Sequence, residues 1–143
     1  MQPSVLKKFD LLNGLSEEQL ENIIPLMVQA EYDLNDTIIT EGKSNDKIYF
    51  IINGQVEIIK GNTLIARLGE GSAFGDMEVL DVIPATASAR ALSQVSVLTI
   101  ANRALRAIYN MDVKTFSLII MNLARELSRR LRKMDETLAS LKP

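Results

Sequence analysis

The stretch from Gly69 to Ala91, GEGSAFGDMEVLDVIPATASARA, decides the fold of this 143-residue chain. Glycines punctuate its first part, a short helix is expected to begin at Phe74-Gly75-Asp76, and a strand of alternating small residues follows Pro84. Glycine lets a ligand come close to the main chain, and free N–H groups at a helix start attract anions and sugar hydroxyls. The stretch therefore predicts a turn, a helix start and a strand arranged to meet a small ligand.

Short β-branched runs separated by Gly, Asn and Asp surround this stretch. Asn53-Gly54 predicts a two-residue hairpin, since both residues tolerate positive φ, and Lys60-Gly61-Asn62 predicts a second turn. Many short strands joined by tight turns are typical of an antiparallel roll or barrel. The expected strands are residues 36–40, 48–52, 55–59, 63–68, 87–91 and 95–100.

Helical patterns flank the strands. Ser16 and Gln19 have the spacing of a capping box, and Pro25 ends or kinks the helix that follows. Asn102 is expected to cap a short helix, and Asp112 a long one that reaches Leu141, about 43 Å away at 1.5 Å per residue.

The long helix carries a narrow apolar seam with an unbroken 4,3 spacing. Such a heptad seam is narrower than the stripe of a helix that lies on a globular core. Near Phe116, Leu118 and Ile119 the apolar face widens, which favours packing on the roll; the last three heptads favour a partner helix. The sequence thus predicts a homodimer through Ile120, Ala124, Leu127, Leu131, Met134, Leu138 and Leu141.

Composition excludes several classes of function. The net charge is −2 without a long basic tract, which argues against nucleic-acid binding by this chain. Without cysteine or histidine, the chain has no disulfides, no thiolate or His-base catalysis and no His- or Cys-based metal site. Its apolar runs are far shorter than the ~20 residues of a membrane span, and no signal peptide precedes Lys7-Lys8. We therefore expect a cytoplasmic, non-enzymatic protein with no catalytic residues and no metal.

The order of these features resembles the cyclic-nucleotide-binding domain family of catabolite-activator-type regulators and protein kinase A regulatory subunits. Phe74-Gly75-Asp76 resembles the family's Phe-Gly-Glu, and residues 84–91 its Pro-Arg-Ala-Ala-Thr-Val-Arg-Ala. Asn35 and Asn45 stand where the family has turn glycines and are expected at positive φ. Further matches are Glu41-Gly42, Tyr49-Phe50-Ile51 and Asn53-Gly54-Gln55-Val56.

The resemblance implies an α+β, mainly β fold over the whole chain. It consists of an antiparallel β-roll, of the double-stranded β-helix or jelly-roll type, with an N-terminal helix and a long C-terminal dimerisation helix. The single domain then divides into an N-terminal helical part (1–30), the β-roll (31–100) and the C-terminal helices (101–143).

By the same resemblance, Phe74, Gly75, Asp76 and Thr86 are the ligand-binding residues, with Asp76 accepting a ribose hydroxyl. Ala85 stands where the family has the arginine that pairs with the phosphate. In an extended strand, alternation places Arg90 on the face opposite to that of Ala85. Losing one charge-assisted contact to phosphate lowers the affinity about 10- to 100-fold. Cyclic AMP or GMP, the only cofactor implied, is therefore expected to bind weakly or not at all.

Three functions stay open. The first is a sensor or regulatory module, for a cyclic nucleotide or a less anionic ligand. The second is a ligand-independent module for dimerisation or for binding a protein partner. The third is the sensor half of a transcription regulator whose DNA-binding part is absent from this chain, which ends at Pro143.

Overall fold

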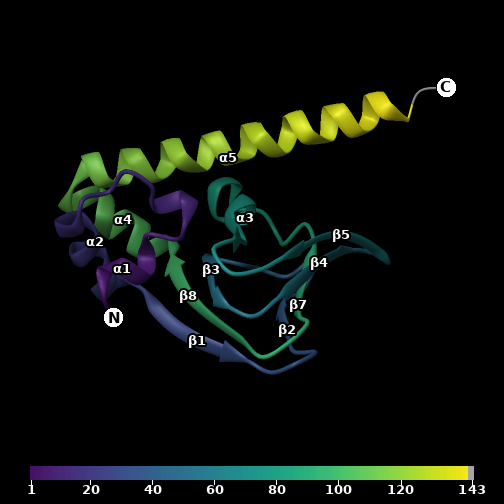
Figure 1. Cartoon of the computed structure of the whole chain (residues 1–143), viewed down its shortest axis with the longest axis horizontal. Helices are drawn as coiled ribbons and strands as arrows, with labels where there is room; N and C mark the ends of the chain where they lie inside the picture. The colour runs from purple at the N-terminus through teal and green to yellow at the C-terminus, as the bar shows by residue number, and fades with distance from the viewer. Residues whose placement is uncertain (142–143) are drawn as a thin grey trace.

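Two four-stranded antiparallel sheets form a roll in the computed structural model, which describes residues 1–141 (Figure 1). The strand order is β1-β8-β3-β6 in the first sheet and β2-β7-β4-β5 in the second. The strands are β1 (Val28–Tyr32), β2 (Thr37–Ile39), β3 (Lys47–Asn53), β4 (Val56–Lys60), β5 (Thr63–Leu68), β6 (Ala73–Phe74), β7 (Ser88–Ala91) and β8 (Val95–Ala101). The antiparallel β-roll with its flanking helices is thus confirmed.

Helices gather at one side of the roll, and the longest one crosses above it (Figure 1). The elements are α1 (Pro3–Leu6), η1 (Asp10–Leu12), α2 (Glu17–Ile23), η2 (Ile24–Leu26), α3 (Asp76–Asp81), α4 (Asn102–Met111) and α5 (Val113–Ser140). Ser16 and Gln19 form the expected capping box at the start of α2. The last two residues of the expected C-terminal helical part, 142–143, lie outside the described residues.

The two strands that the sequence pattern did not reveal are β1 and β6. β1 begins at Val28, so the roll starts before the expected boundary at residue 31. Its sequence, VQAEY, holds one β-branched residue, and it becomes a strand by pairing along its whole length with β8. β6 has only two residues, which is too short to produce a periodic pattern.

The hairpin expected at Asn53-Gly54 is wrong. β3 pairs with β6 and β8 whereas β4 pairs with β5 and β7, so the chain passes here from one sheet to the other. Gly54 has φ +96°, and a Cβ on it would lie 2.4 Å from the Gln94 carbonyl oxygen. Glycine at this position therefore allows the chain to turn tightly from one sheet into the other. The second expected turn, at residues 60–62, does join β4 to β5.

Two expectations about asparagines are also wrong. Asn102 is the first residue of α4 rather than its cap; the N-cap is Ala101, whose side chain offers no hydrogen bond to the helix. Asn45 is not at positive φ, although Asn35 is, with φ +74°. Asn45 instead shapes its turn with its side-chain amide, which donates to the Lys47 carbonyl at 3.0 Å.

The first half of α5 is firmly attached to the body of the protein. Ile119 and Leu123 are buried in a core that also contains residues of α2, α4 and β8. The buried Asn122 amide donates to the carbonyls of Leu11 at 3.0 Å and Asn13 at 2.8 Å. Asp112 caps the helix as expected, accepting from the Lys114 N–H at 3.1 Å.

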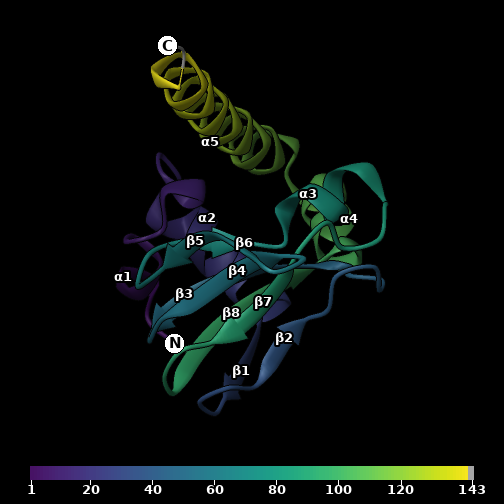
Figure 2. The same ribbon diagram turned by 90° about the vertical axis from the view of Figure 1, so that its right-hand side faces the viewer.

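The second half of α5 projects away from the roll in both views (Figures 1 and 2). Of the seven seam residues, Ile120 and Leu127 are half-buried and Ala124 is exposed. The other four are between 61% and 74% exposed, so packing on the roll does not explain them. They are Leu131, Met134, Leu138 and Leu141.

Candidate functional site

We call residues 74–86 the cassette: the end of β6, the helix α3 and the loop after it. Phe74 is buried and its ring stacks on Tyr49, with centroids 4.9 Å apart and planes 6° apart. Both rings belong to the apolar core between the two sheets. Phe74 is therefore a packing residue, which holds the start of the cassette on β3.

The backbone conformation at residue 75 requires glycine. It precedes α3 with φ +82°, and a Cβ there would lie 2.7 Å from the Lys47 carbonyl oxygen. The Asn45 side-chain amide also donates to the Gly75 carbonyl at 3.1 Å. The turn thus needs glycine whether or not a ligand approaches it.

Asp76, the first residue of α3, is buried beneath α5. Its side chain is 4% exposed, and its Oδ2 lies 3.4 Å from the Nη1 of Arg130. The Nε of Arg130 lies 3.4 Å from the Glu126 carboxylate one turn earlier on α5. The carboxylate that the sequence assigns to a ribose hydroxyl therefore already has an ionic partner.

Glu78 is a second buried carboxyl in the cassette, and it has no cationic partner among the described residues. Burial raises its pKa above the ordinary value, and the charge of Asp76 acts in the same direction. The Asn45 amide, 3.3 Å from its Oε1, lowers the pKa in part. Ionised Glu78 is therefore disfavoured in the folded chain.

Glu78→Gln is expected to stabilise the protein at neutral pH. Because the folded-state pKa of Glu78 is raised, the stability it contributes is complete below the unfolded pKa and is lost as pH rises through the folded one. Glutamine removes that loss and keeps an acceptor for Asn45. Thermal unfolding of both proteins at pH 4 and pH 7 measures the effect; a gain that is equal at both values would contradict it.

Ala85, at the position where the family has arginine, lies in apolar and enclosed surroundings. It is 4% exposed and belongs to the core between the sheets, as do Ala89 and Ala91. The expected alternation holds within β7, whereas Ala85 and Ala87 precede that strand and Ala87 is half-buried. Arg90, on the other face, pairs with the Glu57 carboxylate across the sheet. It is therefore not a substitute for the missing cation.

Thr86 is half-buried, and its carbonyl accepts a hydrogen bond from Lys60 Nζ at 2.8 Å. Lys60 and Arg130 are the cations within hydrogen-bond or ion-pair distance of the cassette in residues 1–141. Each already has an acceptor. Within residues 1–141, the cassette thus holds two buried carboxyls and offers no cation without an acceptor.

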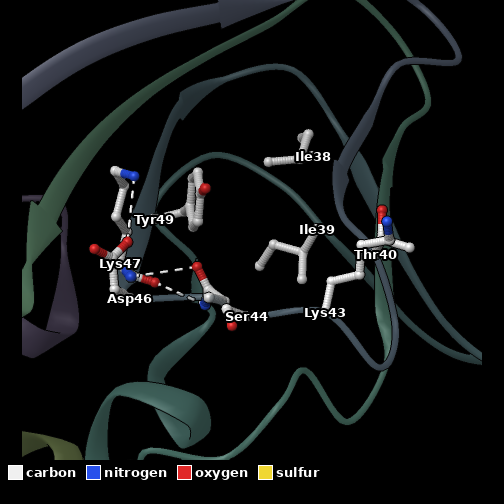
Figure 3. Close-up of a pocket in the computed structure, with 9 residues that line it drawn as sticks. Ile38, Ile39, Thr40, Lys43, Ser44, Asp46, Lys47 and Tyr49 are labelled. Atoms are coloured by element: carbon white, nitrogen blue, oxygen red, sulfur yellow. Dashed lines mark hydrogen bonds and ion pairs between the residues drawn. The ribbon is translucent and has the colours of Figure 1, made fainter.

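A pocket of about 220 Å³ lies between β2, β3 and the loop that joins them (Figure 3). Ile38, Ile39 and the Tyr49 ring form its walls, and Ser44 lies at its floor. Burial raises the pKa of the Tyr49 hydroxyl to about 12, with Tyr32 adding to the effect, so this hydroxyl stays protonated. The pocket is smaller than the ~300 Å³ at which ligand sites of proteins usually begin.

A wider apolar groove of about 340 Å³ lies between α3, α4 and α5. Val79 and Leu80 of α3 face Tyr109 of α4 and Ile120 of α5 across it. Leu80 is 43% and Tyr109 53% exposed.

Sequence reasoning found the cassette but missed the residues that surround it. Phe74, Gly75 and Asp76 lie together at the start of α3, while Thr86 lies at the far end of the loop, next to Lys60. From the sequence, Arg130 is one of several charged residues beside the seam. Its pairing with Asp76 could not be predicted, because the two residues are 54 positions apart. Its Glu126 partner, at i,i−4, was the one visible signal.

A family profile described as "Cyclic nucleotide-binding domain" matches residues 29–112. A Mycobacterium tuberculosis protein described as "CRP-like cAMP-activated global transcriptional regulator" is 26% identical over 142 residues, covering 96% of this chain. The "Cyclic AMP receptor protein" of Thermus thermophilus is 27% identical over 135 residues, covering 91% of this chain. The chain spans 62% and 61% of the lengths of these two relatives.

Solved structures show the same fold. The catabolite activator protein of Thermus thermophilus matches with a TM-score of 0.81 at 28% identity, over 92% of this chain and 62% of that one. A cyclic nucleotide-binding domain from Methylobacillus flagellatus matches with a TM-score of 0.86 over 99% of this chain and 83% of that one. At 22% identity, the second match is evidence for the fold alone.

Proposed function

The chain belongs to the cyclic nucleotide-binding domain family, a family of regulatory or sensor domains, and from this premise we propose that it is a non-enzymatic member that binds cyclic AMP and cyclic GMP weakly or not at all. The observation that carries the proposal is the buried, apolar environment of Ala85. A phosphate there would meet no guanidinium, since the side chain at this position is a buried methyl group. The cytoplasmic location expected from the sequence belongs to the same proposal.

We expect a dissociation constant no tighter than roughly 100 μM for cyclic AMP or cyclic GMP, since the charge-assisted pair is lost. Ala85→Arg should tighten the binding of cyclic AMP about tenfold or more. Isothermal titration of both proteins measures this. Ala87→Arg, two residues further along the chain and half-buried, is the control and should bind no better than the wild type.

One outcome would contradict the proposal, and a second would contradict its explanation by the missing arginine. A sub-micromolar isotherm for the wild type would mean that another cation reaches the phosphate, and Lys60→Met would then identify Lys60 by abolishing it. A folded Ala85→Arg variant that binds no better than the wild type would mean that the cassette has lost more than its cation. Thermal unfolding without ligand shows that each variant is folded.

The second part of the proposal is a homodimer through the projecting half of α5. Its four exposed seam residues form one apolar line that the roll does not cover. A parallel two-stranded coiled coil would bury that line, with Leu at both seam positions and Met134 as an adaptable knob. Each buried Leu contributes about 1.5–3 kcal/mol, which favours association at micromolar concentrations.

The alternative function, a module that binds a protein partner without a ligand, is favoured by the groove between α3, α4 and α5. Exposed apolar patches of this kind often mark interaction sites. Tyr109→Ser, in the same groove but outside the cassette, would then abolish binding of a partner while leaving titrations with cyclic AMP unchanged. In a longer regulator of the kind found among the relatives, the same domain would act as the sensor half.

A further inference from the structure

The pocket between β2, β3 and the loop that joins them lies outside the cassette, and the proposed function does not use it. Its nine lining residues fall between residues 38 and 49, and none of them belongs to residues 74–86. Its volume of about 220 Å³ corresponds to roughly seven water molecules at ~30 Å³ each. The pocket can therefore hold a compound of roughly six to ten non-hydrogen atoms, which is much smaller than a nucleotide.

Two opposite sides of the pocket are apolar. Figure 3 shows the Tyr49 ring on one side of the space and the side chains of Ile38 and Ile39 on the other. One face of the Tyr49 ring is stacked on Phe74 with planes 6° apart, so its edge and its other face are open to the pocket. Tyr49 and Ile39 belong to the core between the sheets, which fixes these walls. A flat aromatic ring suits the space between an aromatic and two branched aliphatic side chains.

The charged residues of the pocket leave one positive charge in excess. Lys47 Nζ lies 3.3 Å from the Asp46 carboxylate, and these two charges compensate each other. The exposed Lys43 forms no ion pair with any other of the residues 1–141. The Tyr49 hydroxyl, whose pKa is raised to about 12, stays protonated and adds no negative charge. The pocket therefore favours an anion over a neutral molecule or a cation.

The loop that carries Lys43 is already ordered without a ligand. The Lys43 N–H donates to the Thr40 carbonyl at 3.0 Å, and the Lys43 carbonyl accepts from the Ala85 N–H at 2.8 Å. The Asn45 side-chain amide closes the loop by donating to the Lys47 carbonyl at 3.0 Å. Binding therefore does not require the ordering of this loop, which lowers its free-energy cost.

We propose that this pocket binds a small aromatic carboxylate of the size of benzoate. The ring of the ligand lies between Tyr49 and the two isoleucines, and its carboxylate lies at the rim beside Lys43. The hydroxyls of Thr40 and Ser44, which also line the pocket, are further donors for the carboxylate. The inference goes beyond the proposed function and does not depend on it, because neither the cassette nor the seam of α5 contributes a lining residue.

A titration of the full chain with benzoate, followed by the amide chemical shifts, tests the site. Shifts should move within residues 38–49 and saturate with a dissociation constant of about 1 mM or tighter, while those of residues 113–140 stay in place. Unmoved shifts within residues 38–49 at tens of millimolar benzoate would overturn the site.

Two further probes test the class of ligand. Benzamide has nearly the same shape as benzoate without the charge and should bind about threefold more weakly, the size expected for an exposed charge pair. Acetate has the carboxylate without the ring and should give no saturable shift at tens of millimolar. Equal binding of benzamide would overturn the preference for an anion, and equal binding of acetate would overturn the role of the apolar walls.

Two variants locate the ligand in the pocket. Ser44 is exposed, so Ser44→Phe should fill the space without disturbing the core and should abolish the shifts caused by benzoate. Lys43→Met should weaken benzoate about threefold and leave benzamide unchanged. Lys114→Met, which removes an equal charge from an exposed position on α5, is the matched control and should bind benzoate like the wild type.

Circular dichroism shows that each variant is folded. Unchanged affinity for benzoate in folded Ser44→Phe would overturn the proposal. Equal weakening by Lys43→Met and Lys114→Met would mean that only the overall charge matters, and that result would overturn the placement of the carboxylate beside Lys43.

Discussion

Replacing Leu131 and Leu138 with aspartate is expected to convert a homodimer into a folded monomer. Both side chains are more than 60% exposed on the described chain, so the substitutions leave the core untouched. In the proposed coiled coil they would place four carboxylates in the seam and remove four buried leucines. At about 1.5–3 kcal/mol for each leucine, the dissociation constant should rise by more than ~1,000-fold.

Light scattering coupled to size exclusion measures the mass, and circular dichroism shows whether the monomer stays folded. Lys133→Asp with Ser140→Asp is the matched control, because both positions lie on α5 away from the seam and are exposed. The control should keep twice the chain mass. A wild-type chain that stays monomeric at tens of micromolar would refute the dimer.

Gly54→Ala is expected to destabilise the fold by about 3 kcal/mol or more, which is the second large effect. The methyl group would lie 2.4 Å from the Gln94 carbonyl oxygen and 2.9 Å from the Val95 Cα, both backbone atoms that cannot rotate away. The φ of +96° adds strain for any residue with a Cβ. The substitution therefore acts on the corner between the two sheets.

Urea unfolding followed by fluorescence of the tyrosines measures this loss as a lower midpoint. Gly69→Ala is the control, because a Cβ at that position meets no atom within 4 Å. Its midpoint should lie close to that of the wild type. Equal midpoints for Gly54→Ala and the wild type would show that the corner can relax.

The roll could be predicted because most of its strands show as short β-branched runs bounded by turn residues. β5 matches its expected bounds, and the other expected strands differ by one residue at one or both ends. The pairing of strands was less accessible: Asn53-Gly54 has the composition of a hairpin, yet its two strands separate into different sheets. Local turn chemistry reports the backbone conformation of a turn, whereas the choice of partner strand depends on residues far away in sequence.

The candidate site was predicted in part for the same reason. Phe74-Gly75-Asp76 could be placed at a helix start from neighbouring residues alone, and Ala85 could be placed on the inner face from strand alternation. The pair between Asp76 and Arg130 joins segments 54 residues apart, and no period links them. Asn45 was expected at positive φ, whereas it shapes its turn by donating a hydrogen bond from its side-chain amide.

The anchoring of α5 at Asn122 has a mechanical consequence. From that anchor to Ser140, the helix extends about 27 Å at 1.5 Å per residue. Leu127 and Arg130 hold its first part against the core and Asp76, and the part beyond Arg130 is an exposed rigid arm. A tilt of about 10° at the anchor would carry the tip through about 5 Å, since a rigid helix transmits angle over its full length. The same tilt displaces the helix by about 2 Å at Arg130, eight residues from the anchor, so a movement there is roughly doubled at Ser140.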